Sequence, residues 1–146
     1  MAFEKAIRQD IAGIFTQFLA AHTSAGNISF KEFESFWISK DFSLIHYSCL
    51  EKERRAEFMM LIYDSLLLHL TSSMNASRFC IFVYSMFLFY HTQPKDHSFA
   101  SIPITFLQWD LIMNSLSDFS SKNFTDPICC FDDLFKRRAF EFSLRK

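Results

Sequence analysis

The chain has 146 residues, of which half are hydrophobic, 20 are Phe and only 2 are Gly. Its length is that of one domain, and we predict a single domain over residues 1–146. This composition excludes an intrinsically disordered chain and a loop-rich scaffold. The 15 basic and 16 acidic side chains nearly cancel, so the chain as a whole is not a polycation built to bind nucleic acid.

Neither a leader nor a membrane segment is expected. The first ten residues, MAFEKAIRQD, carry charges that a secretory signal lacks. The most apolar stretch, residues 79–90, has twelve residues, whereas a helix that spans a bilayer needs about 20. None of the four Cys belongs to a CxxC pattern, so we expect four buried free thiols that fill space in the core.

Hydrophobic residues recur at steps of three and four along most of the chain, which predicts helices. The first helix covers residues 3–22 and ends before Gly26, which favours a left-handed stop. Ser29 and Glu32 have the spacing of a capping box and begin a second helix. A short segment around residues 42–45 follows.

The middle of the chain predicts two longer helices. The third covers residues 50–70, and its first turns are charged. The fourth covers residues 76–91 and is apolar almost all round, so we expect it to lie in the centre of the molecule. Gln93-Pro94 ends it, because the residue before Pro leaves the helical region.

After this helix the pattern changes briefly. Residues 102–104 are predicted to be extended, Thr105 begins a fifth helix that runs through Leu116, and Thr125 caps a sixth. The predicted fold is therefore all-α. It is a compact bundle of about six helices with one short extended segment near 102–104.

The sequence contains no catalytic pattern: GxSxG, HExxH and glycine-rich phosphate loops are all absent. Gly26, Ile28 and Glu32 are spaced like the second half of an EF-hand loop, but the earlier ligand positions hold two Ala and one Thr. A helix cap explains the same letters. We therefore predict that the chain is not an enzyme and that it has no metal site, no cofactor and no small-molecule substrate. A degenerate calcium sensor is the least favoured hypothesis for its function.

The histidines do not form a site by pattern. His22 and His69 fall on apolar helix faces, which favours hydrogen-bonded core residues over ligands. His91 and His97 flank a Pro-containing linker and are close enough in sequence to meet. Two imidazoles without a third ligand still make a weak metal site.

Two surface features are candidates for binding. Lys136, Arg137 and Arg138 form a basic cluster, which is either a helix end that complements the helix dipole or a contact to DNA phosphate or an acidic partner. The aromatic residues of the fourth helix form a stripe that is either core or part of a protein interface, since twenty Phe exceed what one small core readily encloses. The candidate partner-binding residues are Arg78, Tyr84, Phe87, Tyr90, Gln93 and Trp109.

Several of these residues form an ordered series of motifs. The series begins with Phe18, then Phe30, Phe33 and Trp37, then Phe42 and Ile45. It continues with Val83-Tyr84, Phe87, Phe89-Tyr90 and Thr92-Gln93, then Ile102-Pro103-Ile104 and Trp109-Asp110. It ends with a helix that begins at Asp126, contains Phe131 and Leu134, and closes on residues 138–142. The series resembles the N-terminal domain of subunit 1 of the snRNA-activating protein complex, also called the 43-kDa subunit or the gamma subunit of the proximal-sequence-element-binding factor.

The resemblance implies a non-catalytic scaffold subunit in the nucleus. Its complex binds the proximal sequence element and supports transcription of snRNA or other short noncoding RNA genes by RNA polymerases II and III. In this family the Myb repeats of the largest subunit and the zinc-containing third subunit read most of the DNA, and subunit 1 docks their helices. Promoter DNA would then be reached mainly through the complex. The alternative hypothesis is a stand-alone helical protein–protein adaptor unrelated to DNA.

Overall fold

The computed structural model describes residues 2–22, 27–95 and 99–143. Helices dominate this part of the chain, which confirms the predicted all-α class. In chain order its elements are α1 (Ala2–Ala21), α2 (Phe30–Ser39), the 3₁₀ helices η1 (Phe42–Ser48) and η2 (Lys52–Arg54), α3 (Arg55–Leu67), α4 (Ala76–His91), β1 (Ile102–Thr105), α5 (Phe106–Ser121), α6 (Asp126–Lys136) and β2 (Phe140–Ser143).

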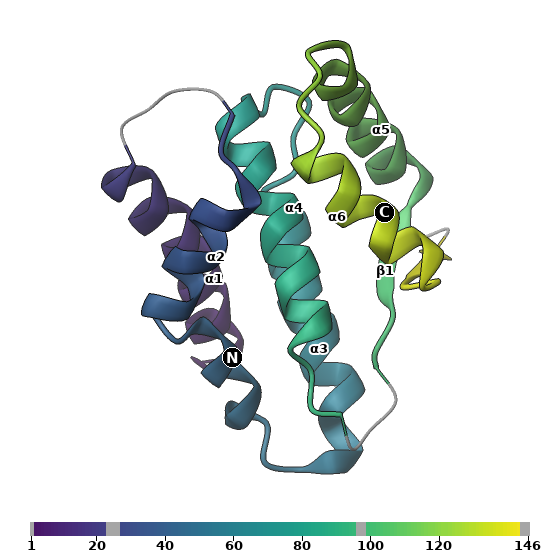
Figure 1. Cartoon of the computed structure of the whole chain (residues 1–146). Coiled ribbons are helices and arrows are strands. Elements are labelled where there is room, and N and C mark those ends of the chain that lie inside the picture. The colour runs from purple at the N-terminus through teal and green to yellow at the C-terminus, as the bar shows by residue number, and fades with distance from the viewer. Residues whose placement is uncertain (1, 23–26, 96–98, 144–146) are drawn as a thin grey trace.

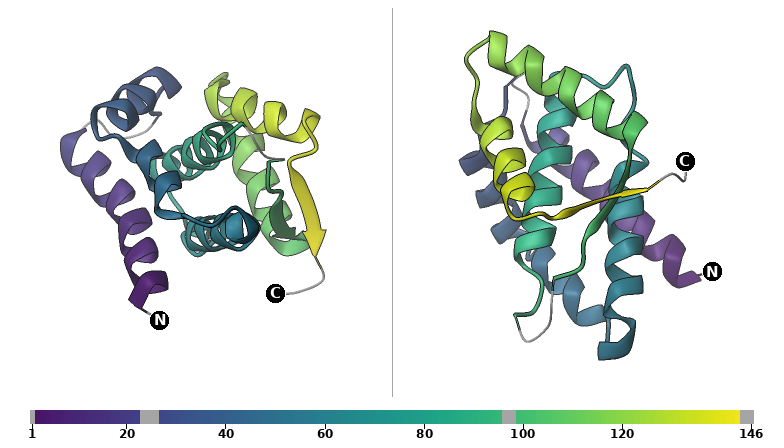
Figure 2. Two further views of the ribbon diagram at one scale, coloured as in Figure 1. Left: turned by 90° about the horizontal axis from the view of Figure 1, so that it is seen from below. Right: turned by 90° about the vertical axis from the view of Figure 1, so that its right-hand side faces the viewer.

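Helix α4 lies in the middle of the bundle (Figure 1). On one side of it are α1 and α2, on the other α5, α6 and the strands, and α3 lies behind it; the view from below shows the same order (Figure 2). Eleven of its 16 side chains are buried. A helix that is apolar all round has to be covered on several sides, so the predicted central position of this helix is confirmed.

The predicted helix caps are correct at two helices and wrong at a third. Ser29 Oγ accepts the Glu32 N–H at 3.1 Å, while the Glu32 carboxylate accepts the Ser29 N–H at 3.3 Å, which confirms the capping box. Thr105 begins α5 with an equivalent box. Thr125 makes no side-chain cap bond, because its backbone is already helical whereas an N-cap residue needs an extended one.

Two helix boundaries differ from the prediction. Helix α3 begins at Arg55 rather than at residue 50, because the residues just before it form η2. Helix α5 continues to Ser121 rather than ending at Leu116, since Phe119 adds a further buried side chain to its apolar face. The charged first turn of α3 and the polar last turn of α5 gave no sequence signal for where these helices begin and end.

The C-terminal motif was predicted as part of a helix, and this is wrong. Helix α6 ends at Lys136, and Arg138 has a φ of 57°, in the left-handed region that a continuing helix excludes. The chain then forms β2, which pairs in parallel with β1. Ile102 lies opposite Phe140 in this two-stranded sheet. The extended segment near 102–104 is therefore confirmed, and its pairing with the end of the chain is a non-local feature.

The cysteines do not all behave as predicted. Cys80 and Cys130 are buried, and burial raises the pKa of their thiols to about 11 and about 12. Cys49 is half-buried and Cys129 is exposed. Neighbouring residues on a helix point about 100° apart, so the adjacent pair on α6 cannot both face the core. None of the helices in the described part of the chain is long and apolar enough to cross a membrane.

Candidate partner-binding surfaces

Tyr84 is a core residue. Its side chain is completely buried, and its ring packs edge-on against Phe30 at a centroid distance of 5.4 Å and tilted against Phe33 at 5.8 Å. The Tyr84 hydroxyl donates to the carbonyl of Ile28 at 2.6 Å. This bond fixes the segment that leads into α2, so Tyr84 joins α4 to α2. A contact between Tyr84 and a partner stays a prediction, and it would require a surface that this fold keeps closed.

Phe87 and Tyr90 continue the stripe toward the end of α4. Phe87 is half-buried and packs edge-on against Phe30 at 5.4 Å. Tyr90 is 8% exposed and packs edge-on against Phe99, and burial raises the pKa of its hydroxyl. Most of the predicted stripe is therefore covered by neighbouring elements, and partner contacts at Phe87 and Tyr90 stay predictions.

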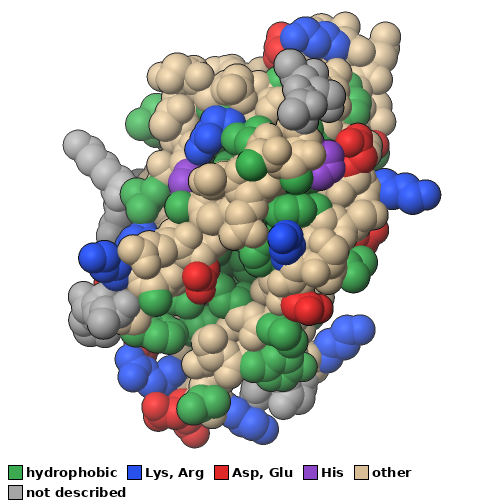
Figure 3. All heavy atoms as spheres, turned by 90° about the vertical axis from the view of Figure 1, so that its left-hand side faces the viewer, with side chains coloured by type: hydrophobic (Ala, Val, Ile, Leu, Met, Phe, Trp, Pro, Cys, Tyr) green, Lys and Arg blue, Asp and Glu red, His purple; other side chains and the backbone are tan. Residues whose placement is uncertain are grey.

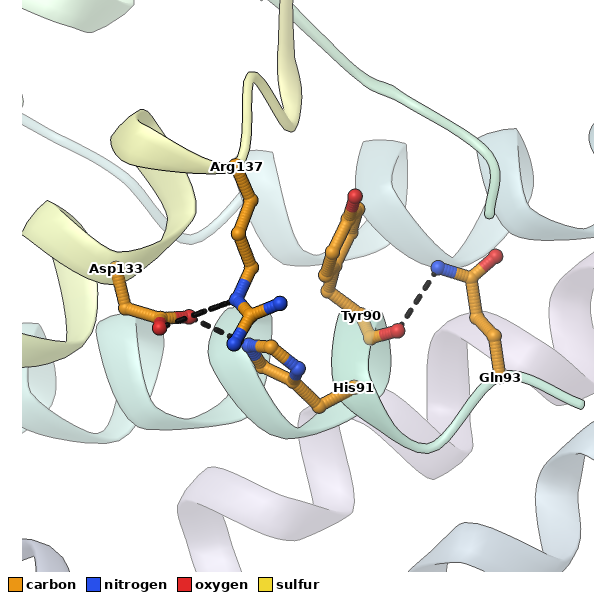
Figure 4. A network of polar contacts seen from close by, with 5 residues as sticks. All are labelled: Tyr90, His91, Gln93, Asp133 and Arg137. Carbon is orange, nitrogen blue, oxygen red and sulfur yellow. Dashed lines mark hydrogen bonds and ion pairs between the residues drawn. The ribbon is translucent and has the colours of Figure 1, made fainter. Parts of the chain in front are cut away.

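Gln93 connects α4 to the segment that precedes β1. Its side chain is buried, and its Nε2 donates to the carbonyl of Tyr90 at 2.9 Å (Figure 4). The same Nε2 donates to the hydroxyl of Tyr63 at 3.3 Å. Its Oε1 accepts the N–H of Ala100 at 2.8 Å. A buried amide with this many partners is a structural bridge. A partner contact at Gln93 stays a prediction.

The preceding Thr92 joins a second buried bridge. His46 Nε2 lies 2.9 Å from Thr92 Oγ1, and that hydroxyl donates to the carbonyl of Leu88 at 2.7 Å. The hydroxyl proton is thus used, so His46 Nε2 carries the hydrogen and donates to Thr92. Arg55 Nη2 donates to the carbonyl of His46 at 3.0 Å. Burial and then the Arg55 charge lower the pKa of His46 to about 4.

His91 forms an ion pair across two helices. Its Nε2 lies 2.6 Å from Asp133 Oδ2, and Arg137 Nε donates to the same carboxylate at 3.1 Å (Figure 4). Burial alone would raise the pKa of Asp133, but the hydrogen bonds from His91 and Arg137 outweigh it and hold the pKa below its usual range. The network joins α4 to α6. The predicted meeting of His91 with His97 lies outside the described residues.

The basic cluster follows the end of α6. Lys136 pairs with Asp132 at 2.9 Å and Arg137 with Asp133 at 3.1 Å, while Arg138 occupies the left-handed residue after the helix. All three side chains are exposed. Two of these cations are thus neutralised by carboxylates one turn earlier, which supports the helix-end interpretation, and a phosphate or acidic-partner contact stays a prediction.

Arg78 lies at the opposite end of α4. Its N–H is capped by the Asn75 side chain at 2.9 Å, and its guanidinium lies over the Phe15 ring, 5.1 Å from the centroid. His69 stacks on the same Phe15 ring at 4.3 Å, and burial followed by the Arg78 charge lowers its pKa. Arg78 is half-buried and covers the core with its stem. A partner contact at Arg78 stays a prediction.

Trp109 is half-buried and lies among exposed aromatic side chains. Its ring contacts those of Phe135 at 5.7 Å and Phe142 at 5.1 Å, and Phe106 stacks on Phe142 at 5.0 Å. Phe106 and Leu107 are 60% and 72% exposed, and Phe135 and Phe142 are about half exposed. We call this surface the Trp109 patch; its residues are Phe106, Leu107, Trp109, Phe135 and Phe142.

Sequence reasoning found only Trp109 in this patch. Phe106 and Leu107 lie on the first turn of α5 with Trp109, whereas Phe135 and Phe142 lie on the last turn of α6 and on β2, far from α5 in the sequence. Phe106 and Leu107 directly follow the cap residue Thr105. Two apolar side chains in the first turn of a helix are the local signal that could have indicated an exposed apolar surface here.

A second apolar surface lies on the far side of the bundle. The face drawn in Figure 3 is hollowed and lined by hydrophobic side chains. A pocket of about 430 Å³ lies between α1, the segment between η1 and α3, and α3 itself. Its lining includes Phe3, Leu50 and Phe58, and Leu50 is 90% exposed.

The described residues contain no cluster of three or more His, Cys, Asp or Glu side chains that would hold a metal ion. Glu32, which resembles an EF-hand ligand by spacing, uses its carboxylate in the α2 capping box. The thiols of Cys80 and Cys130 and the imidazole of His46 are buried, and His91 forms an ion pair with Asp133.

Comparison with known families identifies one match. A family model described as small nuclear RNA activating complex (SNAPc), subunit 1, matches residues 7–146. The matched range includes the whole Trp109 patch and both strands. A comparison with curated proteins gave no significant match.

Proposed function

Because the chain belongs to the family of subunit 1 of the small nuclear RNA activating complex, we propose that it serves there as a non-catalytic scaffold. The family places the chain in a multisubunit assembly that acts in snRNA transcription. In the proposed role, the chain docks other subunits in the nucleus and contacts promoter DNA mainly through them. The complex would bind the proximal sequence element and support RNA polymerases II and III.

The Trp109 patch is the observation that supports docking. Four aromatic side chains from three separate elements contact one another there, and the exposed Leu107 follows Phe106 on the first turn of α5. Aromatic side chains that gather on a surface are typical of protein interfaces, where Trp and its neighbours supply most of the binding free energy. The partners we propose are the Myb-repeat largest subunit and the zinc-containing third subunit.

Replacing the most exposed part of the patch tests this proposal. We expect the double variant Phe106→Ser, Leu107→Ser to recover the Myb-repeat or zinc-containing subunit at least about tenfold less well in affinity purification, because removing each anchor costs about 1–2 kcal/mol. Its thermal unfolding should match that of the wild type, since both side chains are more than half exposed.

The matched control removes two exposed apolar side chains from another surface. Leu44→Ser with Tyr47→Ser changes residues that are 59% and 73% exposed on η1. This variant should recover both subunits as the wild type does. If the control variant lost the subunits while the Phe106→Ser, Leu107→Ser variant kept them, docking at the Trp109 patch would be contradicted.

We also propose that the basic cluster contacts DNA phosphate within the complex. Replacing Lys136, Arg137 and Arg138 with Ala should then reduce the slope of log binding constant against log salt by roughly 2–3, because each phosphate that a cation neutralises contributes about 0.9 to the slope. The measurement is a salt titration of promoter DNA binding by the assembled complex.

A control with the same change in charge separates contact from general electrostatics. Lys5, Lys31 and Lys40 are exposed on α1 and at α2, and their triple Ala variant should leave the slope unchanged. An unchanged slope in the Lys136–Arg138 variant would show that these cations act only at the end of α6.

A further inference from the structure

Strand β2 has one edge that no described element covers. Ile102 N–H donates to the carbonyl of Ala139 at 2.7 Å, and Ile102 lies opposite Phe140. In a parallel pair of strands, this bond fixes which residues of β2 direct their backbone N–H and C=O groups toward β1. The backbone groups of Glu141 face β1, and those of Phe140 and Phe142 face away from it. Within the described part of the chain, the N–H and C=O groups of Phe140 and Phe142 form no hydrogen bond with another element.

The two faces beside this edge have different chemistry. One face carries the rings of Phe140 and Phe142, which contact Trp109 at 5.8 Å and 5.1 Å. The opposite face carries Glu141 and lines a groove against α3 and the start of α5. The charged residue that β2 contributes to this groove, Glu141, is acidic.

Strand β2 also lies at the outside of the molecule. It runs across the side that faces the viewer in the view from the right-hand side, and it lies at the periphery in the view from below (Figure 2). Natural proteins protect an edge strand with charge, Pro or a covering element, because its unpaired backbone groups are a template for another strand. On β1 the residue that faces away from β2 is Pro103, which has no backbone N–H group. The free edge of β2 instead presents the N–H groups of Phe140 and Phe142.

We propose that the outer edge of β2 takes up an extended segment of a partner protein as a third strand, with apolar and basic residues alternating along that segment. Its backbone would pair with Phe140 and Phe142, its apolar side chains would cover the rings of these two residues, and its basic side chains would face Glu141. This inference rests on the proposed scaffold role, because it describes how one partner is held. Strand addition obtains affinity from backbone bonds and specificity from alternate side chains.

Amide hydrogen exchange gives a test with its own internal control. The amides of Phe140 and Phe142 should exchange at least about tenfold more slowly in the purified promoter complex than in the full chain alone, because they form hydrogen bonds only there. The amides of Glu141 and Ile104 already face the partner strand and should change much less. Equal slowing of all four amides, or no slowing at Phe140 and Phe142, would overturn strand addition.

A probe peptide tests the same edge without the complex. The heptapeptide Lys-Val-Lys-Val-Lys-Val-Lys, added to the full chain, should shift the amide resonances of Phe140 and Phe142. It should bind at least about tenfold more tightly than the same peptide with Glu for Lys or with N-methylated Val. Glu141→Lys should abolish the difference between the Lys and Glu peptides. Equal binding of all three peptides, or pairing of this edge with a second copy of the chain, would overturn the proposal.

Failure of this inference is distinguishable from failure of the scaffold role. A chain that recovers the other subunits while Phe140 and Phe142 exchange unchanged docks them elsewhere, which overturns strand addition and leaves the scaffold. A chain that binds the probe peptide but recovers neither subunit has the strand-binding edge and lacks the proposed role.

Discussion

Replacing Tyr84 with Ala should lower the free energy of unfolding by about 3–5 kcal/mol, the range for removing a large aromatic side chain from a packed core. The ring is fully buried between α4 and α2, and its hydroxyl holds the carbonyl of Ile28 at 2.6 Å. Urea denaturation of the full chain, followed by circular dichroism, measures the change. This is the largest effect on stability that we expect from a single substitution among the predicted site residues.

Tyr84→Phe is the matched control for the hydroxyl. It keeps the ring against Phe30 and Phe33 and removes only the donor to Ile28, so we expect a loss of about 1–2 kcal/mol. The two variants together separate packing from hydrogen bonding. A stability loss below about 1 kcal/mol for Tyr84→Ala would show that this side chain is not part of the core and would restore it as a surface candidate.

Acid should destabilise the protein through His46, by about 3 kcal/mol in total. The pKa of His46 is lowered to about 4 in the folded chain by burial and by Arg55, whereas an ordinary His has a pKa near 6.5. At pH values between these two pKa values, His46 binds a proton in the unfolded chain but not in the folded chain. The contribution of neutral His46 to the free energy of unfolding is therefore fully present above about pH 6.5. It decreases as the pH falls toward 4 and then levels off.

The neutral state of His46 follows from its contacts. Nε2 donates to Thr92, and Nδ1 faces the guanidinium of Arg55 at 3.5 Å, so a second ring proton would point at a cation. His69 also has a lowered pKa and adds to the loss in the same direction. The informative measurement is thus the difference between wild type and His46→Gln in urea denaturation at about pH 7 and about pH 4.5. Equal losses in the two proteins would contradict this account.

Local features of the fold were predictable because their causes are local. The Ser29–Glu32 box, the Thr105 cap and the all-round apolar pattern of α4 each depend on residues within one or two helical turns. The pairing of β2 with β1 is different, since it joins residues about 38 positions apart. Nothing near Phe140 in the sequence indicates that partner, and the motif reads equally well as the end of a helix.

The excess of Phe is now divided between core and surface. Ten of the twenty Phe are buried and six more pack against the core. The four that are exposed are Phe3, Phe106, Phe135 and Phe142. Three of these four lie in the Trp109 patch, so most of the aromatic excess forms core and the small remainder is concentrated on one surface.

The candidate site was only partly predictable for the same reason. Trp109 was found from its place in an ordered motif, whereas its exposed neighbours come together only through the sheet and the end of α6. Tyr84 was chosen from the aromatic stripe of α4 and Gln93 from the polar end of that helix, but both hold the fold together by buried hydrogen bonds. Motif position therefore located important residues without separating surface from core.

Chromatin immunoprecipitation of the tagged full chain tests the central claim most directly. We predict enrichment over the proximal sequence elements of snRNA or other short noncoding RNA genes. This enrichment should be abolished in the Phe106→Ser, Leu107→Ser variant and kept in the Leu44→Ser, Tyr47→Ser control. A folded, expressed wild-type chain that shows no enrichment at any of these promoters would contradict the assignment as a promoter-complex scaffold.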